Sequence, residues 1–416
     1  MFEDVLNLFK NVFEKPFKVG IISYYYPYQN PSISGVGTHV YNLVTHLSKL
    51  GCEVHVFTYS DKKDNLRKIR VGNGKIILHF LKASFPFEID DSVISKRTRY
   101  AIFENLVLNE ASLENSRSSF DILHTHGWLT SSAFMLKYLY SLPWVHTVHA
   151  LERNRLPSMT DEEKRLYNLT SWIEDTIVNA DKLIAVSNSA SKELIRAFGN
   201  KISKKIEVIP NGVDLELFNK GNSKSKSILS ISRFSKEKGI ELLPKIADKV
   251  LSADDEAEFK IIAPETQIST IEYIQDSFRE LEKKYGKRFN WISKPLFPLE
   301  IAPYYKHSSI YLQPSFYETF GLCIVEGMAS GNAIVATNVG GIPEVVGKAG
   351  ILVEPNAEDI SSGIIKLLKS NNLLESYKKK SLERAKLFNW SIIVKKTFDL
   401  YKEVIRRKIE IESQRK

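Results

Sequence analysis

The sequence predicts an α/β protein built on parallel, doubly wound sheets. Short apolar strands alternate with helical stretches along most of the chain, which is the pattern of βα units. A glycine-containing segment follows the first expected strand, where a parallel sheet lets backbone approach a ligand. The chain has 416 residues, enough for two or three domains with large cores.

The first half of the chain supplies one set of βα units. Ser34 to Thr38 carries Gly35 and Gly37 and leads into a helix that ends at Gly51. The polar segment 219–227 is rich in Gly, Ser and Lys and predicts an interdomain linker. The expected strands before it are 17–23, 53–58, 75–80, 120–126, 144–149, 182–187 and 205–209.

The second half repeats the pattern without an internal sequence repeat. A last amphipathic helix opens near Trp390 and continues through Phe398 and Tyr401. We therefore expect a first domain over 17–216 and a second over 225–390. The strands expected in the second domain are 228–232, 258–263, one near Trp291, 310–312, 332–336 and 351–354.

Composition limits the partners. The formal net charge of +9 favours anionic ligands or surfaces, and no zinc-finger spacing or RNA-binding signature supports nucleic acid. Two cysteines, Cys52 and Cys323, indicate a reducing cytoplasm rather than a disulfide framework. No apolar run reaches membrane-spanning length, and acidic residues near the start argue against a signal peptide.

Residues 1–16 form a separate expected element, because residues 2–13 place apolar side chains at helical spacing. This amphipathic helix could pack on its own domain or on a second subunit, giving a homo-oligomer. It could also contact the inner membrane face peripherally. The mixed charge of its polar face favours packing against protein.

The stretch from Pro314 to Glu344 carries the strongest chemical signal. Glu318 precedes an expected helix that begins within 319–322, and Glu326 lies one or two turns inside it. A helix N-terminus offers unpaired N–H groups and partial positive charge, which suit a phosphate. The carboxylates suit hydroxyl groups instead. Together they predict a pocket for a nucleoside diphosphate sugar.

This stretch resembles the E-x7-E segment of glycosyltransferase family 4, the retaining enzymes that include sucrose synthase, phosphatidylinositol mannosyltransferase and actinobacterial-type glycogen synthases. The resemblance covers nearly the whole chain after residue 16. It implies the GT-B fold, two Rossmann-like domains facing a cleft, with the helix over 391–416 packing back on the first. It implies that Glu318 binds the donor sugar and Glu326 the ribose. The amides of Phe320, Gly321 and Leu322 would contact the diphosphate and sugar.

Two cations follow the first strand of the second domain. Arg233 and Lys238 bracket a loop at the carboxyl end of that strand, where they could neutralise a diphosphate. The family carries the same R-x4-K pair for the donor's phosphates. The resemblance also implies donor contacts from Gly35 and Gly37, although Ser34 replaces a glycine that the family often has.

Histidines end two strands of the first domain. His149 matches a family histidine beside the donor sugar, and His126 is either an acceptor-side neighbour or a structural histidine. Asn211 lies in a P-N-G-V-D run that the family places near the cleft. The paired histidines do not form a recognisable metal-ligand set, and no D-x-D motif occurs. We expect no metal and no cofactor, the nucleotide sugar being a substrate.

Together with these observations, the resemblance implies a retaining hexosyltransferase, with glucose favoured and UDP-glucose or ADP-glucose as candidate donors. The segment from His149 to Glu174 resembles bacterial glycogen synthases, which favours an α-glucan acceptor. The basic charge and the amphipathic start keep open a lipid-linked or membrane glycan. A sugar-nucleotide epimerase on the same fold is a further alternative. Ala263-Pro264 replaces a glycine turn of the family, which leaves the donor base open.

Overall fold

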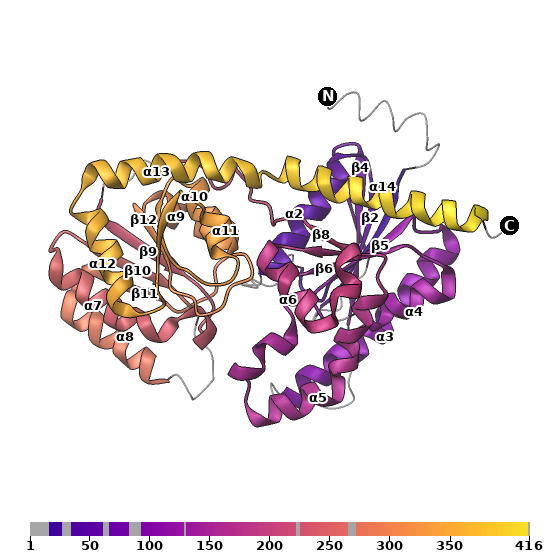
Figure 1. The fold of residues 1–416 in the computed structure, drawn as a ribbon, viewed down its shortest axis with the longest axis horizontal. Coiled ribbons are helices and arrows are strands. Elements are labelled where there is room, and N and C mark those ends of the chain that lie inside the picture. Colours follow the sequence, from indigo (N-terminus) through magenta and orange to yellow (C-terminus); the bar gives the residue numbers. More distant parts are fainter. Residues whose placement is uncertain are drawn as a thin grey trace.

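The computed structural model describes residues 16–26, 35–60, 66–82, 93–128, 130–221, 225–264 and 272–414. The expected helix of residues 1–15 lies outside this part of the chain. Two lobes lie side by side, and each is organised around one sheet (Figure 1). None of the described helices combines the length and apolarity that a membrane span requires.

The first sheet is parallel except at one edge. Its eight strands follow the order β3-β4-β2-β1-β5-β6-β7-β8, and only β3 runs antiparallel, to β4, among the described pairings. The strands are β1 (Lys18–Ile22), β2 (Glu53–Tyr59), β3 (Arg67–Val71), β4 (Gly74–Leu81), β5 (Ile122–His126), β6 (Trp144–Val148), β7 (Lys182–Ala185) and β8 (Ile206–Val208).

Sequence reasoning missed β3 because its residues are largely charged and exposed, as suits an edge strand. Gly72, at a φ of +59°, turns the chain back into β4. The other strands of this lobe follow the predicted positions. The helices of the lobe are α2 (Gly35–Lys49), α3 (Val93–Arg117), α4 (Ser131–Tyr140), α5 (Asp161–Asp175) and α6 (Asn188–Phe198).

The second sheet is parallel throughout its described pairings, in the order β11-β10-β9-β12-β13-β14. Its strands are β9 (Ser227–Ile231), β10 (Glu258–Ile262), β11 (Phe289–Ile292), β12 (Ile310–Gln313), β13 (Ala333–Thr337) and β14 (Gly350–Val353). The helices are α7 (Leu243–Ala253), α8 (Glu272–Tyr285), α9 (Pro298–Lys306), α10 (Leu322–Ala329), α11 (Ile342–Val346), α12 (Ala357–Leu368) and α13 (Asn371–Ala385). Two Rossmann-like lobes confirm the predicted fold class.

The last helix, α14 (Trp390–Gln414), continues the line of α13 and crosses onto the first lobe (Figure 1). Phe398 and Tyr401 pack against Phe17, and the Tyr401 hydroxyl meets His124 Nδ1 at 2.5 Å. Trp390 is 1% exposed and lies against Gly212, where an added Cβ would come within 2.5 Å of the indole. The helix therefore ties the end of the chain to the first lobe through a buried aromatic face.

Candidate active site

Lys238 and Glu318 meet on the second lobe. Lys238 Nζ lies 2.8 Å from Glu318 Oε2, and both side chains are largely buried. Gly239 makes this approach possible, because it adopts a φ of +70° and a Cβ there would lie 1.9 Å from the Pro314 carbonyl oxygen. The loop carrying the cation is thus pressed against the loop carrying the acid. Sequence analysis predicted both residues but not their contact.

Arg233 lies at the start of the same loop. Its guanidinium is about half exposed and donates to Glu237 Oε1 at 2.6 Å. The Glu237 carbonyl accepts the backbone N–H groups of Phe316 and Tyr317, which anchors the loop ahead of Glu318. Each predicted cation is therefore paired with a carboxylate in this structure. Their role toward a diphosphate stays a prediction.

Helix α10 begins at Leu322, later than the earliest predicted start, and residues 319–321 form its entry loop. Gly321 is the N-cap at a φ of +93°, a conformation that glycine adopts without strain. The Phe320 ring is buried against Phe388, with ring centroids 5.6 Å apart. Phe320 can therefore serve a ligand through its backbone rather than its side chain.

Glu326 lies one turn inside α10, as predicted. The Tyr305 hydroxyl donates a hydrogen bond to Glu326 Oε2 at 2.9 Å. Burial raises the pKa of Glu326 to about 7. A ligand that donates hydrogen bonds to this carboxylate would favour its ionised form.

The first lobe presents a second helix N-terminus. The prediction put Gly35 and Gly37 in a loop ahead of the helix, but α2 begins at Gly35, so both lie in its first turn. A Cβ at Gly35 would lie 3.2 Å from Leu322 Cδ1, the first residue of α10. Two helix N-termini, with their positive dipole ends, therefore meet between the lobes.

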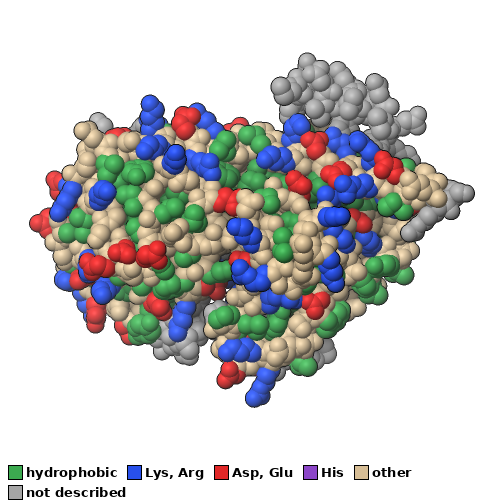
Figure 2. Space-filling view, viewed as in Figure 1, with side chains coloured by type: hydrophobic (Ala, Val, Ile, Leu, Met, Phe, Trp, Pro, Cys, Tyr) green, Lys and Arg blue, Asp and Glu red, His purple; other side chains and the backbone are tan. Residues whose placement is uncertain are grey.

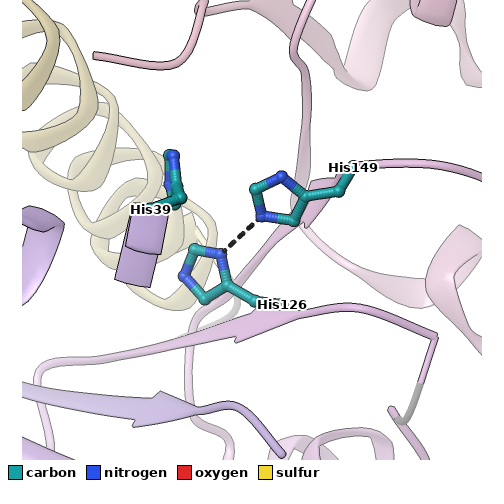
Figure 3. A group of neighbouring side chains, drawn as sticks. All are labelled: His39, His126 and His149. Carbon is teal, nitrogen blue, oxygen red and sulfur yellow. Dashed lines mark hydrogen bonds between the residues drawn. The ribbon is translucent and has the colours of Figure 1, made fainter. Parts of the chain in front are cut away.

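Three histidines of the first lobe gather beside this point: His39 from α2, His126 from β5 and His149 just after β6 (Figure 3). His126 Nδ1 lies 3.3 Å from His149 Nε2. Among the described residues, no hydrogen-bond partner meets the buried atoms His39 Nδ1, His126 Nε2 or Asn211 Oδ1. These atoms are free to bond a polar ligand.

Burial lowers the pKa of all three imidazoles, and that of His149 falls to about 4. The rings are therefore neutral near pH 7 and can each donate and accept one hydrogen bond. Their ligand atoms lie within 4.8 Å of one another, so the trio could also hold a metal ion. The expectation that no metal is required stays a prediction.

Two further histidines on the same strands, His124 of β5 and His146 of β6, have their partners within the core. His124 contacts Tyr401 and Thr147, and His146 Nδ1 lies 2.7 Å from Thr125 Oγ1. The histidines of β5 and β6 therefore fall into two groups. His124 and His146 stabilise the sheet, whereas His126 and His149 lie at its carboxyl edge, facing the second lobe.

The lobes contact each other through the loop that carries Glu318. Thr319 Oγ1 donates to the His149 carbonyl at 2.6 Å, and Ser187 Oγ donates to the Thr319 carbonyl at 2.7 Å. The Tyr317 hydroxyl donates to Glu193 at 2.8 Å. His149 and Glu318 are thereby brought to the same place from opposite lobes. Figure 2 shows the surface notched between the lobes at the edge away from α14.

Sequence reasoning missed several members of this site: Glu237, Tyr305, Thr319 and His39. His39 gave a readable signal, since it stands beside Val40 on a helix face that otherwise packs in the core. Tyr305 and Thr319 gave none, because they act on Glu326 and His149, which are distant from them in sequence. Glu237 lies only four residues after Arg233, but its spacing alone did not distinguish it from other acidic residues.

Known proteins resemble the chain along nearly its full length. The model of Glycosyltransferase Family 4 matches residues 33–217, and that of Glycosyl transferases group 1 matches 215–384. A D-inositol 3-phosphate glycosyltransferase of Corynebacterium glutamicum is 24% identical over 91% of this chain and 94% of its own. An alpha-maltose-1-phosphate synthase of Mycolicibacterium smegmatis is 27% identical over 89% of this chain and 95% of its own.

Solved structures share the fold. The sucrose-phosphate synthase from Thermosynechococcus elongatus superposes with a TM-score of 0.76 at 22% identity, covering 94% of this chain and all of that one. The two adjoining family models divide the chain near residue 216, between β8 and β9, where the sheets also divide. From the paired parallel-sheet lobes and these matches, we conclude that the chain belongs to the GT-B glycosyltransferases of the family-4 type.

Proposed function

We propose that the protein transfers a hexosyl group, with glucose favoured, from a nucleoside diphosphate sugar to a hydroxyl acceptor with retention of anomeric configuration. The convergence of the α2 and α10 N-termini beside the Lys238–Glu318 pair carries this proposal. This place offers the first backbone N–H groups of α10, a cation and a carboxylate within one small volume.

Donor binding would exchange the present ion pairs for contacts with the ligand. The diphosphate takes Lys238 and Arg233, which releases Glu318 to accept hydrogen bonds from sugar hydroxyls. Glu326, already held by Tyr305, accepts from the ribose. Preorganised donors of this kind typically contribute a few kcal/mol each to the stability of a charged transition state.

In the reaction, the bond between the anomeric carbon and the diphosphate oxygen breaks, and the acceptor oxygen bonds to the same face of that carbon. The acceptor's proton passes to the leaving phosphate oxygen, so atoms and charge balance without a covalent enzyme intermediate. Lys238, Arg233 and the α10 amides stabilise the growing charge on the leaving group. The neutral histidines His126 and His149 hold sugar hydroxyls from the first lobe.

An aromatic group at the carboxyl edge of the first sheet supports a carbohydrate acceptor. Tyr24 stacks on Tyr59 with centroids 4.7 Å apart and meets the Tyr100 ring edge-on at 4.6 Å. Trp128 extends the group, edge-on to Tyr100 at 5.6 Å. The four side chains are partly exposed, and aromatic rings in such a position suit the apolar faces of sugar rings. We therefore propose an α-glucan as the acceptor. The alternative of a lipid-linked or membrane glycan rests on the basic charge and on residues 1–15, which lie outside the described part of the chain.

The test is a matrix of donors and acceptors. UDP-, ADP- and GDP-glucose are each incubated with maltooligosaccharides, with D-inositol 3-phosphate, or with no acceptor, and products are followed by mass spectrometry and anomeric NMR. Elongated maltooligosaccharide with a new α-linkage supports the proposal. Transfer to the inositol phosphate alone would contradict the α-glucan acceptor. A product with a β-linkage would contradict retention of anomeric configuration. Conversion of the donor sugar without acceptor would indicate an epimerase.

A further inference from the structure

A second histidine cluster lies away from the site between the lobes, under helix α3. His55 of β2 and His79 of β4 project from neighbouring parallel strands, with His55 beside Ile77 and His79 beside Phe57 in the register. Each is 2% exposed. His55 Nδ1 lies 2.9 Å from His79 Nε2, so two ring nitrogens face each other directly.

The outer nitrogens of both rings face carboxylates. His55 Nε2 lies 2.9 Å from Glu53 Oε1, and His79 Nδ1 lies 3.1 Å from Glu110 Oε1. An ionised carboxylate can only accept hydrogen bonds, so each outer nitrogen carries the proton of its neutral imidazole. The two facing nitrogens then both present lone pairs. At 2.9 Å this arrangement is repulsive unless something electropositive lies between them.

A third ligand atom points to the same place. Glu114, one helical turn after Glu110 on α3, brings Oε2 to 3.8 Å from His55 Nδ1. The ligand atoms of His55, His79 and Glu114 all lie within 4.8 Å of one another. Tetrahedral zinc with bonds of 2.0–2.1 Å to nitrogen separates its ligand atoms by about 3.3 Å. The observed 2.9 and 3.8 Å bracket this value.

The surrounding contacts hold the set in place. Lys75 Nζ lies 2.6 Å from Glu53 Oε2, and Arg117 lies 2.5 Å from Glu114 Oε1, so each carboxylate keeps one oxygen for the cluster. Histidines that bind metals usually donate their other N–H to a carboxylate, which fixes the tautomer. Glu53 and Glu110 occupy this supporting position.

We propose that His55, His79 and Glu114 form a structural site for a divalent metal ion of the zinc type, with Glu53 and Glu110 orienting the two imidazoles. Two imidazoles and a carboxylate are ligands that zinc accepts, with a water able to complete the tetrahedron. The ion joins β2 and β4 to α3 and takes no part in glycosyl transfer.

The test uses the full chain, freed of metal with a chelator, and measures Zn²⁺ binding by competition with a chromophoric chelator. The variants His79→Gln and Glu114→Gln remove or weaken a ligand. His307→Gln removes an exposed histidine of the second lobe, and His126→Gln removes one from the trio between the lobes. Circular dichroism verifies that each variant is folded, and Glu114→Gln keeps the test open if His79→Gln is not.

We expect the wild type, His307→Gln and His126→Gln to share one binding event that His79→Gln loses and Glu114→Gln weakens at least tenfold. In the same proteins, Zn²⁺ raises the unfolding temperature only where that event is retained. Equal Zn²⁺ affinity in wild type, His79→Gln and Glu114→Gln, or undetectable binding in all three, overturns the proposal. The second result would assign the His55–His79 contact to a shared proton.

Discussion

The two lobes meet the same small volume with opposite chemistry. The second lobe offers charge: Lys238 and Arg233, each paired with a carboxylate, and Glu326 with its raised pKa. The first lobe offers neutral polarity: imidazoles whose pKa values are lowered, with ring nitrogens that no described residue satisfies. Under the proposed function, the second lobe would bind the anionic leaving group and the first lobe the neutral sugar.

The largest expected effect comes from removing a cation, Lys238 or Arg233, from the second lobe. Lys238→Ala removes a preorganised cation from the leaving group, and we expect kcat to fall by at least ~100-fold, equivalent to roughly 3 kcal/mol. Arg233→Ala should lose as much. The matched control is Lys236→Ala, an exposed lysine of the same loop. Near-normal turnover of Lys238→Ala and Arg233→Ala would remove both residues from the phosphate site.

The next effect concerns Glu326 and pH. Ribose hydroxyls favour the ionised carboxylate, so bound donor lowers a pKa that is about 7 in the free protein. Donor affinity should therefore rise by about 10-fold between pH 5.5 and 7 and level off above pH 7. Calorimetric titration with a nucleotide sugar, whose diphosphate does not titrate in this range, measures it. Glu326→Gln should bind the donor weakly and show no dependence of affinity on pH, whereas replacing the exposed Glu383 of α13 by Gln should leave the wild-type behaviour unchanged.

A smaller effect is expected from removing a hydrogen bond between the two lobes. Thr319→Val removes the hydroxyl that donates to the His149 carbonyl. A hydrogen bond of this kind contributes about 1 kcal/mol, so kcat should fall about fivefold if the contact forms during turnover. Thr45→Val, which removes an exposed hydroxyl bonded within α2, is the control. Unchanged kcat in Thr319→Val would mean that the catalytic state does not use this contact.

The smallest expected effect is that of pH on kcat, which tests whether the histidines of the first lobe stay neutral. Because the pKa of His149 lies near 4, its imidazole does not change charge between pH 5.5 and 8. At saturating donor, kcat should vary less than twofold across this range. A bell-shaped or sigmoid kcat profile centred near pH 6.5 would show that a cleft histidine titrates, and the contrast between the two lobes would be lost.

Much of the fold could be predicted from the sequence because its signals are local. Apolar strands, glycine turns and the amphipathic α14 each appear within a few residues, and all but β3 of the described strands were expected. β3 failed because an exposed edge strand carries little apolar signal. The E-x7-E and R-x4-K spacings likewise identified Glu318 and Lys238, the two residues that form the ion pair of the second lobe.

The site's pairings could not be predicted, because they join residues far apart in the chain. Nothing local tells that Lys238 meets Glu318, or that Thr319 reaches the His149 carbonyl. The start of helix α2 could not be predicted for the same reason. Gly35 could have ended a loop or begun a helix, and packing against Leu322 of the other lobe accompanies the second outcome.

The proposal that Lys238 and the first amides of α10 bind the donor's diphosphate is tested most directly by a crystal structure of the protein with an intact nucleotide sugar. We expect the pyrophosphate within hydrogen-bonding distance of Lys238 Nζ and the first amides of α10, with the Lys238–Glu318 pair separated. A pyrophosphate bound against His39, His126 and His149 instead, with the Lys238–Glu318 contact intact, would contradict it.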